Sequence, residues 1–395
     1  MRSRGGVQRA GSRSGALRPG GGAERRNRAI PGKSEPSANA HPGGSSLLQH
    51  VTIAVDAMGG DHAPASVVEG VVAALRESSC SVILVGDEAA IRRELERWPN
   101  LPPGLDIVHA EEVVGMDESP VTPIRKKRRS SIRVCADLVR DGRAQGMFSA
   151  GNTGAAMIAA KMVIGTIDGV DRPALAAVMP SQSGFTLVLD VGANVDTKVE
   201  HLRQFAVMGH FYAQEILHTP APRIGLLSIG EEQGKGTDFT RQVFKIMESL
   251  RLNFVGNVEG RDVFRGSVDV IVCDGFVGNV MLKSSEALGE MIAHMLRDEM
   301  SRNWRTRLGY VFARGAFKSL IDRLDYSEYG AAPLLGVKGG CFIGHGVSNG
   351  KAVKNAVLRA REFCEAELHH RMREKIAEMR AFEETLAPPR PQEVV

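Results

Sequence analysis

The chain has 395 residues, enough for one large or two medium domains, and 43% of them are hydrophobic. No apolar run approaches the roughly 18 residues of a membrane-spanning helix, so the sequence predicts a soluble globular protein. The five cysteines are scattered and lack CxxC or metal-ligand spacing. This pattern indicates a reducing compartment and argues against a zinc site or a disulfide framework.

The net charge of +4 is unevenly distributed along the chain. Residues 1–50 carry eight Arg and one Lys against two Glu, a local excess of seven that leaves the remainder near −3. This balance argues against a nucleic-acid-binding protein. Residues 1–48 are rich in Arg, Gly, Ser and Pro and have few large apolar side chains. We expect a disordered tail there, because such a composition cannot offset the entropy of ordering.

Short apolar strands and amphipathic helices alternate from residue 51 onwards. A strand at 51–55 precedes a helix with valines and a leucine on one face, and strand 82–85, helix 89–98 and strand 106–110 follow. The strands are continuous apolar runs, as expected when helices cover both faces of a sheet. The sequence therefore predicts an α/β fold with a doubly wound, mostly parallel sheet over residues 49–370. Residues 371–395 are predicted to finish a C-terminal helix and end in a flexible tail.

Five strand-end loops combine glycine with small polar side chains. Ligands of open α/β sheets bind beyond the carboxyl ends of the strands, so five such loops together predict a shared anion-binding crevice. None contains GxGxxG with an acidic residue about 20 positions on, or GxxxxGK[ST], so no nucleotide cofactor is predicted. The loops are 149–155, 190–196, 229–238, 273–280 and 344–350.

Ser149, Asn152 and Thr153 stand between two glycines where a helix begins. Each can cap the helix, and the free amides of a first helical turn can also hold phosphate. We favour a phosphate site because three such residues occur together. Asp190 and Asp196 have no partner cluster, so no metal site is predicted.

The loop 229–238 places Lys235 between Gly234 and Gly236. Glycine lets a backbone approach a ligand closely, and the ammonium can meet an anion as a point charge. The alternative is a solvated surface turn. His62 and His345 each follow a glycine-rich turn and have either a structural or a site role.

A dense cationic run precedes a helix that turns Ile132, Ala136 and Val139 inward. Such a run is either a solvated face or a docking face for an acidic partner. Its members are Arg125, Lys126, Lys127, Arg128 and Arg129.

An amphipathic helical pair is predicted to project from the body over residues 284–327. Trp304, Leu308, Val311 and Phe312 occur at i, i+4, i+7 and i+8, so they share one face of a helix that also carries many Arg side chains. This pattern fits a subunit interface, a membrane-surface contact or both, and core packing is the alternative.

Taken together, the motifs closely resemble those of the bacterial phosphate acyltransferase family, also called acyl-ACP:phosphate transacylases. The resemblance runs from about residue 51 to 365. The family fold is similar to those of phosphate acetyltransferases and isocitrate dehydrogenase-like proteins. The motifs are VDAMGGDHAP (55–64), SAGNTGA (149–155), DRPALA (171–176), LDVGANVD (189–196), GLLSIGEE (225–232), CDGFVGNV (273–280), EYGAAPLLG (328–336) and GHGVSN (344–349).

This resemblance implies transfer of a long-chain fatty acyl group from the thioester of acyl carrier protein to inorganic phosphate, without a cofactor. The acyl phosphate then feeds phospholipid biosynthesis through a downstream glycerol-3-phosphate acyltransferase. A cytoplasmic homodimer, peripherally associated with the membrane surface, is also implied. The family's catalytic lysine and asparagine fall on Lys235 and Asn279.

We expect phosphate to attack the thioester directly, with Lys235 supplying charge and Asn279 a hydrogen bond. The cationic run would dock the acidic carrier protein, and the apolar face from Trp304 to Phe312 would contact the membrane. The alternatives are a short-chain phosphate acyltransferase that uses acyl-CoA and a non-catalytic anion-binding module. The expected substrate-binding residues are Asp61, His62, Ser149, Asn152, Thr153, Asn194 and His345.

Overall fold

The computed structural model describes residues 50–119, 121–324 and 330–386, so the predicted tail at 1–48 lies outside the described residues. One mixed sheet of eleven strands runs through this part of the chain in the order β3-β2-β1-β4-β11-β10-β5-β6-β9-β7-β8. The strands are β1 Thr52–Asp56, β2 Ser81–Gly86, β3 Leu105–His109, β4 Gly146–Ser149, β5 Ala174–Ser181, β6 Gly184–Leu189, β7 Ile224–Leu227, β8 Phe254–Val258, β9 Val270–Val272, β10 Ala332–Leu335 and β11 Gly340–Ile343.

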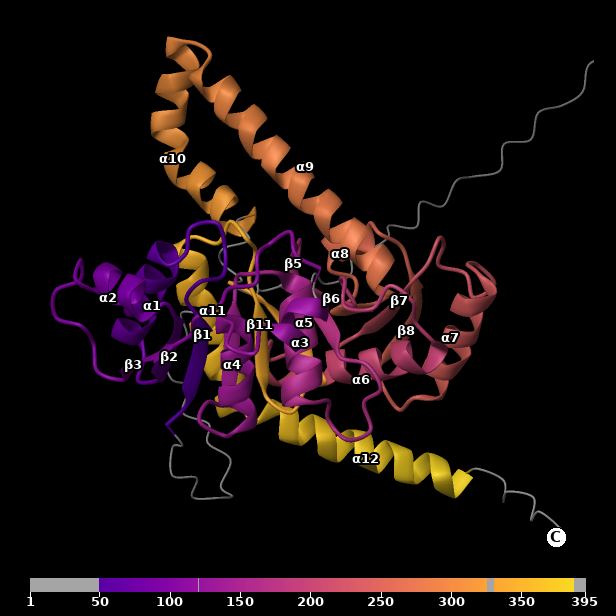
Figure 1. The fold of residues 1–395 in the computed structure, drawn as a ribbon. Coiled ribbons are helices and arrows are strands. Elements are labelled where there is room, and N and C mark those ends of the chain that lie inside the picture. The colour runs from indigo at the N-terminus through magenta and orange to yellow at the C-terminus, as the bar shows by residue number, and fades with distance from the viewer. Residues whose placement is uncertain (1–49, 120, 325–329, 387–395) are drawn as a thin grey trace, which may run out of the picture.

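Helices cover both faces of this sheet (Figure 1). They are α1 Ala65–Glu77, α2 Glu88–Leu95, α3 Val121–Lys126, α4 Ser131–Arg140, α5 Thr153–Ala159, the π-helix η1 Ala160–Ile164, α6 Val199–Glu215, α7 Asp238–Ser249, α8 Asp262–Arg265, α9 Gly275–Ser301, α10 Trp304–Leu324, α11 Gly350–Glu365 and α12 Leu368–Leu386.

Alternate side chains of the strands serve two cores. Ile53 and Val55 belong to the cluster that includes α1, α6 and α11, whereas Ala54 belongs to the opposite cluster with α4 and α5. Successive strand residues point to opposite faces, so an apolar strand such as β1 needs helices on both. The predicted fold class, an α/β protein with a doubly wound and mostly parallel sheet, is confirmed.

The sheet contains two parallel groups of strands that run in opposite directions. One group is β3, β2, β1, β4 and β11, and the other is β6, β9, β7 and β8. Three successive antiparallel pairings, β11 with β10, β10 with β5 and β5 with β6, reverse the direction between the groups.

The register brings the carboxyl ends of both groups to the same region. Ala332 pairs with Ile343 at the end of β11, Leu334 pairs with Leu175, and Ala177 pairs with Val188 near the end of β6. The two groups therefore overlap at their carboxyl ends, although they run in opposite directions. Loops from both groups meet at the centre of the molecule.

Four of the predicted glycine-rich loops end in a helix with a side-chain cap. Asn152 accepts from Ala155 N at 3.0 Å, Thr237 from Thr240 N at 3.2 Å, Asp274 from Val277 N at 2.9 Å and Asn349 from Ala352 N at 2.9 Å. Each cap satisfies an amide that has no partner within its own helix. The small polar residues of these loops thus first determine where the helices begin.

The helices α9 and α10 leave the body side by side (Figure 1). Helix α9 has 27 residues and begins at Gly275, nine residues before the predicted start of the helical pair. Residues 325–327 of the predicted pair lie outside the described residues. In the described chain, no helix is long and apolar enough to cross a membrane.

Candidate active site

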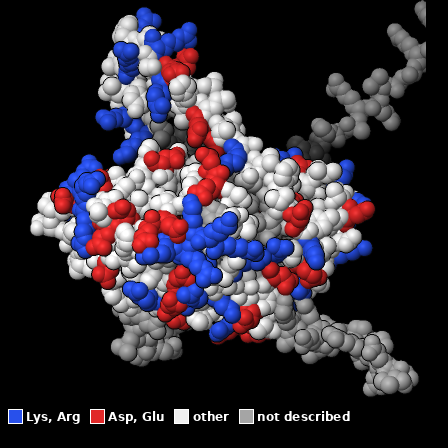
Figure 2. Space-filling view, in the orientation of Figure 1, with Lys and Arg blue, Asp and Glu red and all other residues white. Residues whose placement is uncertain are grey.

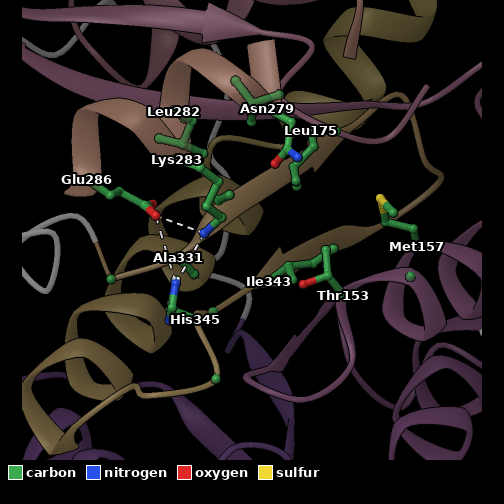
Figure 3. A pocket seen from close by; sticks show the side chains of 18 of the residues that line it. Thr153, Met157, Leu175, Asn279, Leu282, Lys283, Glu286, Ala331, Ile343 and His345 are labelled. Carbon is green, nitrogen blue, oxygen red and sulfur yellow. Dashed lines mark hydrogen bonds and ion pairs between the residues drawn. The ribbon is translucent and has the colours of Figure 1, made fainter. Parts of the chain in front are cut away.

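A cavity of about 530 Å³ lies where the two strand groups meet (Figure 3). It is bounded by the start of α5, strand β5, the loop after β6, helix α9 and the loop after β11. Most of its wall is apolar, including Met116, Met157, Leu175, Leu282, Ala331 and Ile343. Such a cavity suits an apolar ligand oriented by a few polar groups.

Polar side chains gather on the α9 side of this cavity (Figure 3). Lys283 Nζ donates to Glu286 Oε2 at 2.8 Å and to His345 Nε2 at 3.1 Å. Glu286 Oε2 lies 3.9 Å from His345 Nε2. We refer to Lys283, Glu286 and His345 as the cationic cluster, after the ammonium of Lys283, whose charge the Glu286 carboxylate balances. An ammonium has only donors, so His345 Nε2 must accept and carries a lone pair in this arrangement.

Asn279 lies one turn before Lys283 on the same face of α9 and also lines the cavity. The neighbouring loop contacts it at Gly192, where a Cβ would lie in ordinary van der Waals contact with Asn279 Oδ1, at 3.5 Å. Gly278 is more tightly packed, since a Cβ at this position would lie 1.9 Å from the carbonyl oxygen of Asp190. The first turn of α9 is therefore held against the loop after β6.

Of the three residues predicted at the start of α5, Thr153 lines the cavity, whereas Ser149 and Asn152 do not. Ser149 is buried, and its Oγ donates to Asp56 Oδ2 at 2.7 Å. The Nδ2 of Asn152 donates to three carbonyl oxygens, those of Gly115, Met116 and Glu118, at 2.9–3.2 Å. These two side chains hold the loop together, and their contact with phosphate stays a prediction.

Asn194 is also buried and does not line the cavity. Its Nδ2 donates to Pro173 O at 2.7 Å and to Asp190 Oδ2 at 2.9 Å. Asp190 accepts in addition from the backbone amides of Leu175, Gly192, Ala193 and Asn194. Burial raises the pKa of Asp190, while these hydrogen bonds act in the opposite direction. The hydrogen bonds to the Asp190 carboxyl group fix the conformation of the loop that faces Asn279.

Asp61 and His62 are exposed and do not line the cavity either. The amide of Asp61 donates to the carbonyl oxygen of Gly346 at 2.8 Å. This bond places the turn after β1 beside the turn that carries His345. His345 lines the cavity, and the site roles of His345, Asp61 and His62 all stay predictions.

Lys235 is exposed and is not among the residues that line the cavity. Its loop is held by Asn257 Nδ2, which donates to Glu232 O at 3.0 Å, and by Arg241, which donates to Gly236 O at 2.9 Å. Strand β7 lies parallel to its neighbour β9, and β9 leads into α9. The loop of Lys235 and the helix turn of Asn279 therefore follow the carboxyl ends of two adjacent strands.

The cationic run spans the end of α3 and the turn after it. Figure 2 shows Lys and Arg side chains gathered across the middle of this face, over α3. Lys127 forms an ion pair with Glu118 at 2.6 Å, and this contact lowers the pKa of the Glu118 carboxyl group. Arg129 forms an ion pair with Glu111 at 2.6 Å. Arg125, Lys126 and Arg128 are exposed.

The predicted apolar face of α10 is exposed, which excludes core packing within the described chain. The exposed fractions are 69% for Trp304, 50% for Leu308, 66% for Val311 and 83% for Phe312. Helix α9 also exposes apolar side chains, including Phe276, Val280, Leu288, Met291 and Met295. Both helices thus present apolar surface of the kind that marks an interaction site.

Sequence reasoning missed Lys283 and Glu286, which follow the motif 273–280 by one to two turns of α9. Helical spacing could have identified Lys283, because it follows Asn279 by four residues and residues at that spacing share one face of a helix. The proximity of Lys283 to His345, 62 residues further on, appears only in the folded chain. Among the described residues, no group of three or more His, Cys, Asp or Glu side chains could hold a metal ion.

The fold is similar to those of solved phosphotransacetylases. The enzyme from Streptococcus pyogenes superposes with a TM-score of 0.57 at 16% identity, covering 80% of this chain and 95% of that chain. The EutD phosphotransacetylase from Staphylococcus aureus gives a TM-score of 0.51 at 15% identity, with 81% and 95% covered. At these identities the likeness shows the fold alone.

Sequence relatives define the family. The model of a family described as "Fatty acid synthesis protein" matches residues 51–371. A phosphate acyltransferase from Trichlorobacter lovleyi is 52% identical over 328 residues, which is 82% of this chain and 94% of that protein. One from Geobacter sulfurreducens is 50% identical over 326 residues, with the same shares covered. The chain therefore belongs to the phosphate acyltransferase family, as its motifs predicted.

Proposed function

We propose that the protein transfers a long-chain fatty acyl group from the thioester of acyl carrier protein to inorganic phosphate. The observation that carries the proposal is the central cavity, whose apolar wall ends in Asn279 and the cationic cluster. An acyl chain fits the apolar part, while the polar side chains suit a phosphate ion and a carbonyl. The acyl phosphate produced is an activated donor for acylation of glycerol 3-phosphate in phospholipid biosynthesis.

In the proposed reaction, a phosphate oxygen attacks the thioester carbonyl carbon directly. The new C–O bond forms, the tetrahedral oxyanion collapses and the C–S bond breaks. The hydroxyl proton of monohydrogen phosphate ends on the sulfur, so the thioester and phosphate give acyl phosphate and a thiol. The protein has to position the two reactants and stabilise the oxyanion.

Asn279 and Lys235 divide this task in the proposal. Asn279 donates a hydrogen bond to the oxyanion or to phosphate, and its place on the cavity wall supports this role. Lys235 contributes positive charge from the neighbouring loop, where its exposed side chain is able to approach a bound substrate. Neither residue forms a covalent intermediate.

Phosphate-dependent loss of thioester is the decisive test. Purified protein is incubated with palmitoyl acyl carrier protein or palmitoyl-CoA, with and without inorganic phosphate, and both acyl phosphate and free thiol are quantified. We expect consumption only with phosphate and a higher kcat/KM for the carrier protein thioester. Preference for short-chain acyl-CoA would establish the short-chain alternative. Phosphate binding without thioester loss would indicate a non-catalytic anion-binding module.

The exposed apolar surfaces support two further parts of the proposal. We infer that the base of α9 forms a homodimer through Phe276, Val280 and their neighbours, and that the apolar face of α10 contacts a membrane surface. We also propose that the protein is cytoplasmic and peripherally associated with the membrane. Sedimentation equilibrium of the full chain tests the dimer, and a monomer at all accessible concentrations would contradict it.

A further inference from the structure

We propose that Lys283 is the residue that binds inorganic phosphate in the cavity and that His345 carries its proton to the sulfur. This inference rests on the proposed function and assigns roles to groups beyond Lys235 and Asn279. It follows from the cationic cluster, where α9 and the loop after β11 bring the two side chains within 3.1 Å.

The position of Lys283 suits an anion better than that of Lys235. Its side chain lines the cavity beside Asn279, which allows both to reach one substrate from the same helix face. An ammonium has three N–H donors. Glu286 and His345 accept two of them, so the third can donate to a phosphate oxygen. The hydrogen bond to Glu286 fixes the position of the ammonium.

His345 Nε2 accepts the hydrogen bond from Lys283, so this nitrogen can also accept a proton. When phosphate binds, the third N–H of Lys283 donates to one phosphate oxygen, and the ammonium then exchanges its hydrogen bond to Nε2 for a second one to phosphate, while the phosphate hydroxyl donates to Nε2 in its place. The imidazole takes that proton as the C–O bond forms and gives it to the leaving thiolate as the C–S bond breaks. The proton balance of the reaction is preserved, and no further reactant is required.

The third member of the cluster, Glu286, places a carboxylate beside the proposed phosphate site, and its hydrogen bond to Lys283 gives a reason for this position. Glu286 lies one turn after Lys283 and is more shielded, with 27% of its side chain exposed against 51% for Lys283. A carboxylate there repels phosphate but holds the ammonium against the cavity wall. Glu286 is a positioning residue, and its replacement by Gln should raise the KM for phosphate without removing activity.

The test compares Lys283→Met with a matched control, Lys338→Met. Lys338 has the same exposed fraction of 51% and pairs with Asp168 at 2.9 Å, but it does not line the cavity. We expect Lys283→Met to lower kcat/KM for phosphate by about 10²–10³, the typical cost of one such donor. Lys283→Arg should recover part of the loss. Equal kcat/KM values for Lys283→Met and Lys338→Met would overturn the assignment.

His345→Gln separates proton transfer from binding. We expect kcat to fall by about 10²–10⁴, the usual contribution of general acid–base catalysis, with an unchanged KM for phosphate. A kcat equal to that of Lys338→Met would exclude the proton-transfer role. Thermal unfolding of every variant shows whether the fold is retained.

A direct binding measurement distinguishes failure of this inference from failure of the proposed function. If the wild-type protein consumes no thioester, the proposed function fails, yet calorimetric titration with inorganic phosphate still tests the site. Binding to the wild type and to Lys338→Met, with loss in Lys283→Met, supports a phosphate site at Lys283. Equal binding by all three proteins, or none by the wild type, overturns it.

Discussion

Asn279 lines the cavity within one turn of Lys283, and the backbone around Gly192 packs close to its amide. A neutral amide can donate a hydrogen bond without adding charge next to phosphate. We predict that Asn279→Asp lowers kcat more than Asn279→Ala, whose own loss should be about 10²–10³. The carboxylate both removes the donor and repels the nucleophile. Steady-state acyl phosphate formation measures the difference, and equal losses would count against direct contact with substrate.

His369, on α12, provides a pH-dependent prediction that is independent of the reaction. Burial, followed by the nearby charges of His370 and Arg373, lowers the pKa of His369 to about 4 from its ordinary 6.5. Between these pH values the unfolded chain binds a proton that the folded chain does not. Stability should therefore fall as the pH drops from 6.5 to 4, by at most about 3 kcal/mol at about 1.4 kcal/mol per unit.

His369→Gln isolates this contribution. The wild type and the variant are unfolded in urea at several pH values between 4 and 7, and the difference between their free energies of unfolding is plotted. We expect the wild type to lose stability relative to the variant as the pH falls. Parallel curves would show that His369 titrates normally in the folded protein.

At the scale of elements, the first turn of α9 connects the fold to the site. A methyl group at Gly278 would meet the carbonyl oxygen of Asp190, whereas one at Gly289 meets nothing within 4 Å. We predict that Gly278→Ala destabilises the protein by about 1–3 kcal/mol through overpacking and lowers activity by displacing Asn279. Gly289→Ala on the same helix should be stabilising by up to about 1 kcal/mol. Urea unfolding compares the two, and similar stabilities would contradict the close packing.

Helix α10 carries the apolar face that we propose to contact lipid. Replacing both Trp304 and Phe312 with Gln removes two large, exposed apolar side chains without affecting the core. We predict about ten- to hundredfold weaker binding to anionic vesicles and unchanged turnover of the soluble carrier substrate. Vesicle sedimentation measures the binding, with Leu101→Gln as a control at an exposed position in the body. Undiminished vesicle binding would leave α10 as an interface between subunits.

At the scale of the whole molecule, residues 51–395 have a small net charge, near −3, but carry a local basic surface at the cationic run. Such a surface attracts an acidic partner protein over long range. Within the cationic run, Lys127 and Arg129 hold nearby acidic side chains, so Arg125, Lys126 and Arg128 are the better positions for charge reversal. Changing these three to Glu should raise the KM for acyl carrier protein by about tenfold or more and weaken its salt dependence. The KM for acyl-CoA serves as the control. An unchanged KM for the carrier protein would exclude this face as its docking site.

The fold class, the strand-end loops and the family are predictable from the order of the amino acids. Continuous apolar runs indicate strands that are covered on both faces, and capping residues indicate where helices begin. Both are local patterns, so the sequence alone predicts them. Thr153 and His345 were singled out from such patterns and Asn279 from the family resemblance, and all three line the cavity.

Which of these loops come together depends on pairings between segments that are far apart in the chain. Three antiparallel pairings reverse half of the sheet, and their register brings the carboxyl ends of β11 and β6 together. Such register depends on contacts between distant segments and has no local signal. The fold also engages Ser149, Asn152 and Asn194 in hydrogen bonds within the protein, while it joins Lys283 to His345. Small polar residues of the same kinds cap helices and bind ligands, so the sequence does not distinguish the two roles. The hydrogen-bond partners in the folded protein do.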